Sequence, residues 1–238
     1  MTSNKQKILV TGGAGFFGGH ISEGALNRGF EVVIVDVFNS ETTPMAEKAS
    51  NIEHLKKVAK RNNSNLTVYP CSITDELSLT KIFSDENPPV VIHAASLVKD
   101  RQSMDIPLDF IEHNVKGSQI VLNAVERVSN IEQFVFTSSR SAIGEVPGAG
   151  SYMIEENHFR PINPYGASKA AAEGFIHSFH HNTKIPVKIS RMQPMYGPRC
   201  RPDMFVLRIL NSILTGEKIQ KYGTGEGVRD WLFIDDAV

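Results

Sequence analysis

The sequence predicts an α/β fold in which helices cover both faces of a doubly wound, parallel β-sheet. Two observations lead to this fold class. Short apolar, β-rich runs alternate with longer helical stretches nearly throughout the chain, and the first run ends in a glycine-rich turn that leads into a helix. Connections of this length between strands require parallel pairing through right-handed crossovers. Both observations are typical of a Rossmann-type sheet.

Each expected element follows from its own pattern. Continuous apolar runs that end in turn residues, such as KILVTG, are typical of strands buried on both faces. Strands are expected at 7–12, 31–36, 66–70, 89–95, 133–139 and 187–192. Helices are expected at 16–28, at 45–61, from Asp75 as the capping residue, at about 107–128, and in the segment that carries Tyr165. After about Gly197 the alternation becomes less regular.

Composition excludes several classes of protein. With 25 basic and 26 acidic residues and no arginine-rich run, the chain lacks the charge needed to bind nucleic acid. The polar start MTSNKQK is followed directly by a strand, and no apolar stretch is long enough to cross a membrane. Cys71 and Cys200 lack metal-binding spacing, so we expect no metal site and reduced thiols in a cytoplasmic protein.

The turn after the first strand has the pattern of a dinucleotide-binding site. It reads TGGAGFFGGH, with glycines at 12, 15 and 18. Gly12 permits a tight turn, Gly15 allows close approach of a pyrophosphate, and Gly18 lets the helix pack on its strand. Asp36 ends the second strand, where a carboxylate binds ribose hydroxyls and repels the 2′-phosphate of NADP, so NAD is the expected cofactor. The alternative is a glycine-rich turn in an ordinary βαβ unit.

A possible catalytic pair lies in NPYGASKAAAEGF. Tyr165 and Lys169 are one helical turn apart and project from the same face. A neighbouring ammonium and a positively charged nicotinamide would both lower the tyrosine pKa toward the range of a base. Ser139 ends the fifth strand, at the edge of the sheet where ligands bind. The alternatives are a half-buried tyrosine packed on a lysine stem, and a serine that only begins a turn.

These motifs together resemble the NAD-dependent epimerase/dehydratase family, also called the extended short-chain dehydrogenase/reductases. TGGAGFFG, VIHAAS, FVFTSS, NPYGASK, YGPRCRPDM and GVRDWLFIDDAV occur in the family's order and cover essentially the whole chain. Within the family the chain is most similar to UDP-glucuronate and UDP-glucose 4-epimerases, through RPDM and the spacing of Arg101, Ser103 and Pro107. The resemblance implies an NAD-binding domain at 1–192 and a partial, truncated substrate-binding domain at 193–238.

The resemblance also assigns roles to residues. Tyr165 would be the base, Lys169 would tune its pKa and bind the nicotinamide ribose, and Ser139 would bond the substrate oxygen. Arg101 and Arg229 would contact the substrate, Arg229 at its diphosphate, unless they are solvated surface charges. The remaining cofactor contacts would be Gly12, Gly15, Phe16, Phe17, Gly18, Asp36, Ile73, Ala94, Ala95, Ser96 and Asn114, the last supporting the active site.

The implied reaction is epimerisation at C4 of a nucleotide sugar through a 4-keto intermediate, by a homodimer. Dehydratases of the family carry an Asp–Glu pair where this chain has Arg140 and Ser141, so loss of water is not expected. Other departures are Ser72, Ile143 and the segment 192–194, which leave the substrate open. Two alternatives remain: a nucleotide-sugar or hydroxysteroid-type dehydrogenase, and a non-catalytic NAD-binding protein.

Overall fold

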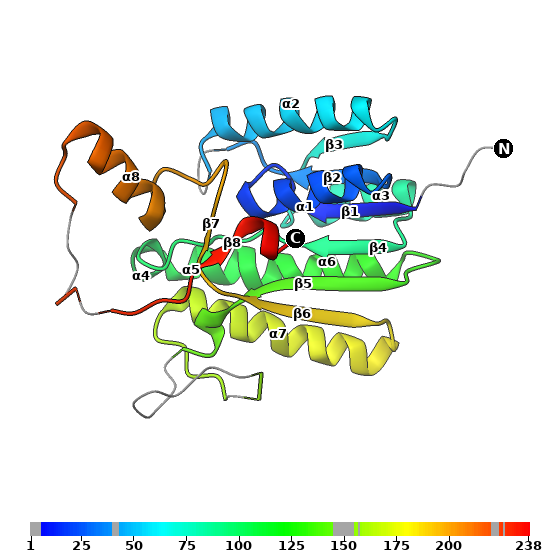
Figure 1. The fold of residues 1–238 in the computed structure, drawn as a ribbon. Helices are drawn as coiled ribbons and strands as arrows, with labels where there is room; N and C mark the ends of the chain where they lie inside the picture. The colour runs from blue at the N-terminus through cyan, green and yellow to red at the C-terminus, as the bar shows by residue number, and fades with distance from the viewer. Residues whose placement is uncertain (1–5, 40–42, 145–154, 157, 220–223, 226) are drawn as a thin grey trace.

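The fold is organised around a central parallel sheet, in a computed structural model that describes residues 6–39, 43–144, 155–156, 158–219, 224–225 and 227–238. Helices lie on both faces of this sheet (Figure 1). Its order is β3-β2-β1-β4-β5-β6, so the direction of winding reverses between β1 and β4. The strands are β1 (Lys7–Thr11), β2 (Glu31–Asp36), β3 (Leu66–Pro70), β4 (Val90–His93), β5 (Gln133–Ser139) and β6 (Val187–Met192). The predicted fold class is confirmed.

Alternate side chains of the strands face two different cores, as the continuous apolar runs predict. Ile8 and Val10 of β1 pack with α1 (Phe16–Asn27) and α2 (Met45–Arg61). Leu9, between them, packs with the helices on the opposite face. These helices are α3 (Glu76–Glu86), α6 (Gly117–Glu126) and α7 (Pro164–Thr183). Asp75 caps α3 as expected, because its side chain accepts a hydrogen bond from Ser78 N at 3.2 Å.

The long helix expected at 107–128 is found as a continuous helical segment at 107–126, with a π-helical turn inside it. After α4 (Gln102–Asp105), the chain forms α5 (Pro107–Phe110), a π-helical turn at Ile111–Lys116, and then α6. Asn114 lies in the π-helical turn, and its side-chain amide forms two hydrogen bonds with the backbone of Leu97. Its Oδ1 accepts from Leu97 N at 2.8 Å, and its Nδ2 donates to Leu97 O at 3.0 Å. Gly117 presses on Ile73, since an added Cβ would lie 2.8 Å from its side chain. A π-bulge satisfies both constraints, and such bulges are frequent at functional sites.

The C-terminal residues form a smaller unit beside the sheet. Two short parallel strands, β7 (Met195–Tyr196) and β8 (Leu232–Phe233), pair with each other, and α8 (Phe205–Thr215) projects away from the sheet (Figure 1). The 3-10 turn at Ile234–Asp236 packs on α1, with Ile234 fully buried. The domain boundary expected at 192 stays a prediction.

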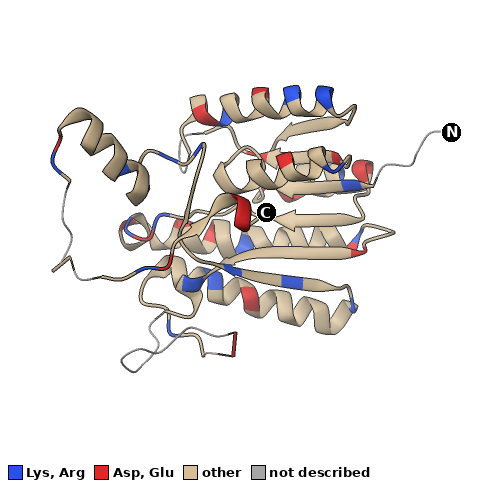
Figure 2. Ribbon diagram, in the orientation of Figure 1, with Lys and Arg blue, Asp and Glu red and all other residues tan. Residues whose placement is uncertain are grey.

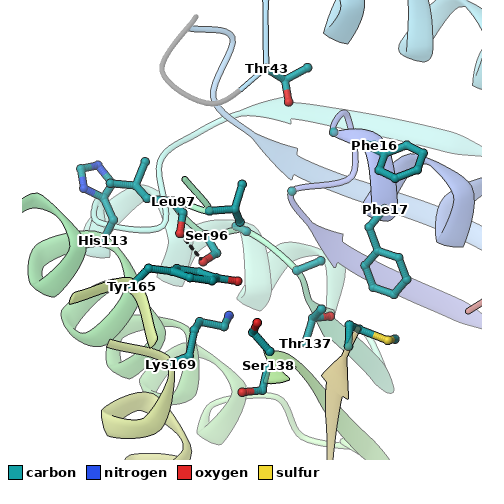
Figure 3. Close-up of a pocket in the computed structure, with 18 of the residues that line it drawn as sticks. Phe16, Phe17, Thr43, Ser96, Leu97, His113, Thr137, Ser138, Tyr165 and Lys169 are labelled. Carbon is teal, nitrogen blue, oxygen red and sulfur yellow. Dashed lines mark hydrogen bonds between the residues drawn. The ribbon is translucent and has the colours of Figure 1, made fainter. Parts of the chain in front are cut away.

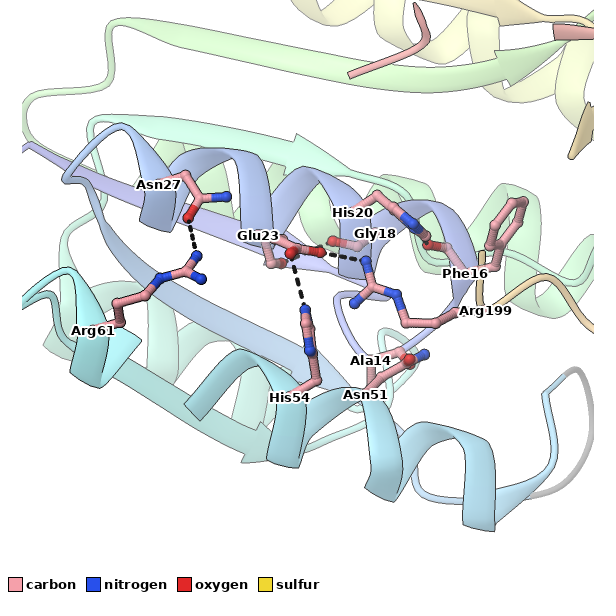
Figure 4. Close-up of polar contacts among 11 residues, drawn as sticks. Ala14, Phe16, Gly18, His20, Glu23, Asn27, Asn51, His54, Arg61 and Arg199 are labelled. Carbon is pink, nitrogen blue, oxygen red and sulfur yellow. Dashed lines mark hydrogen bonds and ion pairs between the residues drawn. The ribbon is translucent and has the colours of Figure 1, made fainter. Parts of the chain in front are cut away.

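A polar cluster holds the segment after β7 against the back of α1 (Figure 4). Glu23 of α1 forms an ion pair with Arg199 and a hydrogen bond of 2.9 Å with His54 of α2. One carboxylate therefore joins the first two helices to the segment that leads into α8.

The outer surface carries both signs of charge, interspersed along the helices (Figure 2). This agrees with the nearly balanced count of acidic and basic residues. None of the helices in the described ranges combines the length and the apolarity that crossing a membrane requires.

Candidate active site

A cavity of about 750 Å³ opens at the carboxyl ends of the strands. Glycines 12, 15 and 18 line it together with Ser139, Tyr165 and Lys169. Figure 3 shows the hydroxyl of Tyr165 and the ammonium of Lys169 directed into the same part of this cavity. The two groups of residues that the sequence analysis singled out separately, the glycine turn and the Tyr–Lys pair, therefore share one site.

The glycine turn forms a cradle of bare backbone. Gly12 has φ +74°, and a Cβ there would lie 2.7 Å from Ala95 N. A Cβ on Gly18 would lie 2.2 Å from Gly12 O. Gly15 is the N-cap of α1 and provides no side-chain cap, so the first N–H groups of the helix are left for a ligand. Such a helix start suits an anion, and the cradle fits a pyrophosphate.

Asp36 is already paired. Its carboxylate accepts hydrogen bonds from Ala14 N at 2.9 Å and from Lys48 Nζ at 3.0 Å, and both side chains are almost wholly buried. Burial raises the pKa of Asp36, and Lys48 opposes this shift. The carboxylate keeps lone pairs for ribose hydroxyls, since an ionised carboxylate has about four acceptor sites. Its charge is neutralised by Lys48, so it repels a 2′-phosphate less than the sequence argument assumed.

The end of the cavity near Asp36 also holds an acceptor without a donor. Asn39 Oδ1 is buried and has no hydrogen-bond partner within the described ranges. Asn39 and Thr43 line the cavity beside Lys48. A buried acceptor is costly unless a donor reaches it, and the hydroxyls or amino group of an adenosine supply donors. This part of the cavity therefore fits the adenosine half of a dinucleotide.

The other expected cofactor contacts are brought to the same cavity, with one exception. The expected contacts that line it are Phe16, Phe17, Ile73, Ala94, Ala95 and Ser96. Ser72, one of the departures from the family pattern, lines it as well. Asn114 is buried behind the lining, where it bonds the backbone of Leu97 and the Ser168 hydroxyl at 2.9 Å. It supports the wall of the site rather than lining it.

Burial dominates the ionisation of the Tyr–Lys pair. It raises the pKa of Tyr165 to about 12, with Asp100 acting in the same direction and the Ser139 hydroxyl opposing it. Burial also lowers the pKa of Lys169 to about 7, while Glu173 acts to raise it. The Lys169 ammonium lies 4.3 Å from the centre of the Phe136 ring. The lowering of the Tyr165 pKa that was expected from Lys169 is therefore not found in this structure, because desolvation outweighs it.

Glu173 lies one helical turn beyond Lys169 and is fully buried. Its carboxylate accepts a hydrogen bond from the Ser138 hydroxyl and forms an ion pair with Arg191, whose Nη2 lies 2.8 Å from Oε2. Arg191 Nε also donates to both carboxylate oxygens at 3.1 Å. This pair ties the ends of β5 and β6 to α7 directly below the catalytic candidates.

A directed series of hydrogen bonds crosses behind the cavity through His93. Ser118 Oγ donates to Asn114 O at 2.6 Å, so it accepts from His93 Nε2 at 3.0 Å. His93 Nδ1 then accepts from Thr11 Oγ1 at 2.7 Å, and Thr11 Oγ1 accepts from Ala95 N at 3.2 Å. Burial lowers the pKa of His93 to about 3, so the ring is neutral with its proton on Nε2.

Three arginines of the described ranges are also part of the cavity lining. Arg140, Arg201 and Arg229 line it, as do Asp100, Asn163, Ser141, Gln193 and Pro194. Arg101 is exposed and is not among the lining residues, and Ile143 is buried outside the lining. Four of the residues described above were not predicted from sequence: Lys48, Asp100, His93 and Glu173. Lys48 and Glu173 lie on helices whose sequence patterns show only ordinary amphipathic faces. His93 ends β4, and a polar residue at the end of an apolar strand could have indicated a place near the site.

Comparison with known proteins gives a consistent result. The model of the NAD dependent epimerase/dehydratase family matches residues 8–238. The UDP-glucuronic acid 4-epimerase of Bacillus cereus, solved with UDP-glucuronic acid and NAD, is 34% identical, with a TM-score of 0.86 over 98% of this chain and 70% of that chain. The UDP-glucose 4-epimerase of Thermotoga maritima, solved with UDP-glucose, is 30% identical, with a TM-score of 0.85 over 98% of this chain and 71% of that chain.

Relatives in sequence include a protein named for a different activity, a dehydratase, and one whose name states no activity. The dTDP-D-glucose 4,6-dehydratase of Dictyostelium discoideum is 32% identical over 98% of this chain, which spans 54% of that protein's length. Protein CapI of Staphylococcus aureus is 30% identical over 98% of this chain, which spans 67% of its length. The chain therefore spans between half and two thirds of these relatives.

Proposed function

The chain belongs to the NAD-dependent epimerase/dehydratase family, and on that premise we propose that it epimerises a nucleotide sugar at C4 through a 4-keto intermediate. One observation carries the proposal: Tyr165, Lys169 and Ser139 line the same cavity as the glycine cradle at the start of α1. A base and a dinucleotide site in one cavity are the minimum that reversible oxidation of a sugar hydroxyl requires.

NAD is the cofactor of this family. Its pyrophosphate would lie on the glycine cradle, and its adenosine would meet Asp36 and Asn39. When bound, NAD takes a hydride from the carbon that is oxidised and returns it later. The cavity also encloses the reacting groups, since Tyr165 is only 9% exposed and Lys169 only 3%.

The chain's own residues would handle the proton. Tyr165 Oη removes the proton of the C4 hydroxyl, and the Ser139 hydroxyl hydrogen-bonds the same oxygen. Burial alone opposes this step, because it raises the pKa of Tyr165 to about 12. A cation beside the phenol, from Lys169 and from the oxidised nicotinamide ring, favours the phenolate. The base is therefore expected to become active only in the complex with the oxidised cofactor.

The residues after Ser139 favour epimerisation over loss of water. Elimination needs an acid close to the leaving hydroxyl. Arg140 and Ser141 line the cavity here, and neither is a carboxylic acid. Release of free NADH with each turnover would instead indicate the alternative, a dehydrogenase. NAD binding without any affinity for nucleotide sugars would indicate a non-catalytic protein.

The test compares the wild-type chain with Tyr165→Phe, using UDP-glucose and UDP-glucuronate as substrates and NMR to detect the 4-epimer. We expect Tyr165→Phe to lose activity by about 10²–10⁴-fold and to keep its affinity for NAD. Tyr196→Phe is the matched control, because Tyr196 lies in β7 and is not among the lining residues. Undiminished turnover by Tyr165→Phe would refute the assignment, and a dehydrated keto sugar as product would favour a dehydratase.

We also propose a cytoplasmic homodimer. Support for the dimer comes from large apolar side chains exposed on neighbouring elements, Met104 on α4, Leu108 on α5 and Phe175 on α7. Light scattering of the purified chain should give twice the mass of one chain, and substitution of Leu108 by Glu should shift it toward the monomer.

A further inference from the structure

We infer that Arg140 binds an acidic group on the sugar ring, so that the chain prefers a nucleotide sugar whose sugar carries a carboxylate. This inference rests on the proposed function and adds the class of substrate to it.

Arg140 stands on a rigid turn beside the proposed base. It follows Ser139 directly and begins the 3-10 turn at Arg140–Ala142, where Ser139 Oγ accepts a hydrogen bond from Ser141 N at 3.1 Å. The turn presses on the start of α7, since an added Cβ at Gly166 would lie 2.3 Å from Ser141 O. Gly166 is the neighbour of Tyr165. The side chain of Arg140 is thus carried by backbone that is packed against the catalytic helix.

The guanidinium of Arg140 forms no direct ion pair in the described part of the chain. It lines the cavity, is partly buried, and makes no hydrogen bond or ion pair with a described residue. Burial and the like charge of Arg229 lower the pKa of Arg140, while the carboxylates of Asp100 and Asp230 act to raise it. A partly buried guanidinium that lines a cavity and forms no direct ion pair favours an anionic ligand.

Asp100 also lines the cavity. Asn163 Nδ2 donates to Asp100 Oδ1 at 3.2 Å, and Asn163 also caps α7 by accepting from Gly166 N at 2.8 Å. The carboxylate of Asp100 acts on the ionisation of both Arg140 and Tyr165. The arginine and the base are therefore close enough to share a charged neighbour.

The diphosphate has other cationic partners. Arg201 and Arg229 line the cavity from the C-terminal part of the chain. Arg140 comes instead from the end of β5, next to the serine proposed to contact the reacting oxygen. An anion held by Arg140 would therefore belong to the sugar ring rather than to the nucleotide.

The experiment measures binding to the NAD-loaded chain in a Tyr165→Phe background, so that turnover does not interfere. UDP-glucuronate, UDP-glucose and UDP are titrated calorimetrically. We expect UDP-glucuronate to bind about 10- to 100-fold more tightly than UDP-glucose, the range of a charge-assisted hydrogen bond. Adding Arg140→Gln should remove this difference and leave the binding of UDP unchanged. Arg127→Gln, which removes an exposed arginine outside the cavity, is the control.

Each other outcome overturns the inference in a recognisable way. Equal affinity for the two sugars before Arg140 is changed means that no acidic sugar is selected. An equal loss for all three ligands in Arg140→Gln means that Arg140 binds the diphosphate. If the acidic and neutral sugars bind equally but are both epimerised by the wild-type chain, the proposed function stands and the inference alone fails. If none of the three ligands binds, the proposed function fails with it.

Discussion

Replacing Gly12 by Ala tests whether the glycine cradle depends on the absence of a side chain. A left-handed backbone, here φ +74°, costs a residue other than glycine about 1–2 kcal/mol. The new Cβ would also lie 2.7 Å from Ala95 N and 2.8 Å from Ala95 Cα. Because those atoms are backbone next to β4, they cannot rotate aside, and such overpacking costs about 1–3 kcal/mol. We expect Gly12→Ala to lower the free energy of unfolding by about 2–5 kcal/mol.

Gly216→Ala is the matched control. Gly216 follows α8 with the same φ of +74°, and an added Cβ there meets nothing within 4 Å. It should cost only the conformational part, about 1–2 kcal/mol. The difference between the two variants then isolates the contact with Ala95.

Urea unfolding followed by circular dichroism gives both free energies, and NAD titration gives the functional effect. Gly12→Ala should weaken NAD binding on the order of tenfold or more, because a pyrophosphate needs close approach to this backbone. Gly216→Ala should bind NAD normally. Equal destabilisation by the two variants, or full NAD affinity in Gly12→Ala, would refute the steric argument.

Three further changes test the buried charges. Lys48→Met leaves the carboxylate of Asp36 without its buried partner and should lower the free energy of unfolding by about 3–5 kcal/mol in urea; Asp36→Asn in the same chain should restore part of it, and no restoration would contradict the pairing. Burial lowers the pKa of Lys169 to about 7, so below pH 7 its buried charge destabilises the folded state. Between pH 7 and 10 the unfolded chain keeps this proton and the folded chain does not, so the free energy of unfolding rises by up to about 1.4 kcal/mol per pH unit. Lys169→Met should remove that rise in unfolding measured across this range, and an unchanged slope would argue against the shift. Glu173→Gln leaves Arg191 without its ion pair and should cost about 3–5 kcal/mol, whereas a change below about 1 kcal/mol would show that the pair contributes little.

The fold was predictable because its central strands are buried on both faces. A run such as EVVIVD has no polar face, which fits a central strand of a parallel sheet and little else. The glycines at 12 and 18 were equally informative, because a side chain at either position would clash with nearby backbone. The π-helical turn inside the helix that begins at Pro107 was not predictable, since it accompanies the contact of Asn114 with Leu97, which no local pattern encodes.

The site was predictable where a residue type is tied to a strand end or a helical turn. Tyr165 and Lys169 were found by their spacing, and the cavity brings them to the glycine turn. The pKa shifts of these two residues were not predictable, because desolvation depends on the surrounding packing rather than on neighbours in the sequence. The pairing of Asp36 with Lys48 was missed for a similar reason, since it joins a strand end to a helix across an intervening loop.

The hydrogen bonds through His93 have a polarity, and this restricts how the chain can change. The hydroxyl of Thr11 donates its one proton to His93 Nδ1, and the hydroxyl of Ser118 donates its proton to Asn114 O. Valine at position 11 would leave His93 Nδ1 without its donor, and alanine at position 118 would leave His93 Nε2 without its acceptor. Serine at 11 or threonine at 118 would keep both hydrogen bonds and their directions. Asn114 continues the series to Ser168, whose hydroxyl donates to Tyr165 O. Hydrogen bonds therefore connect the end of β1, just before the glycine turn, to the first turn of α7, so a substitution at one of these places also affects the packing of the other.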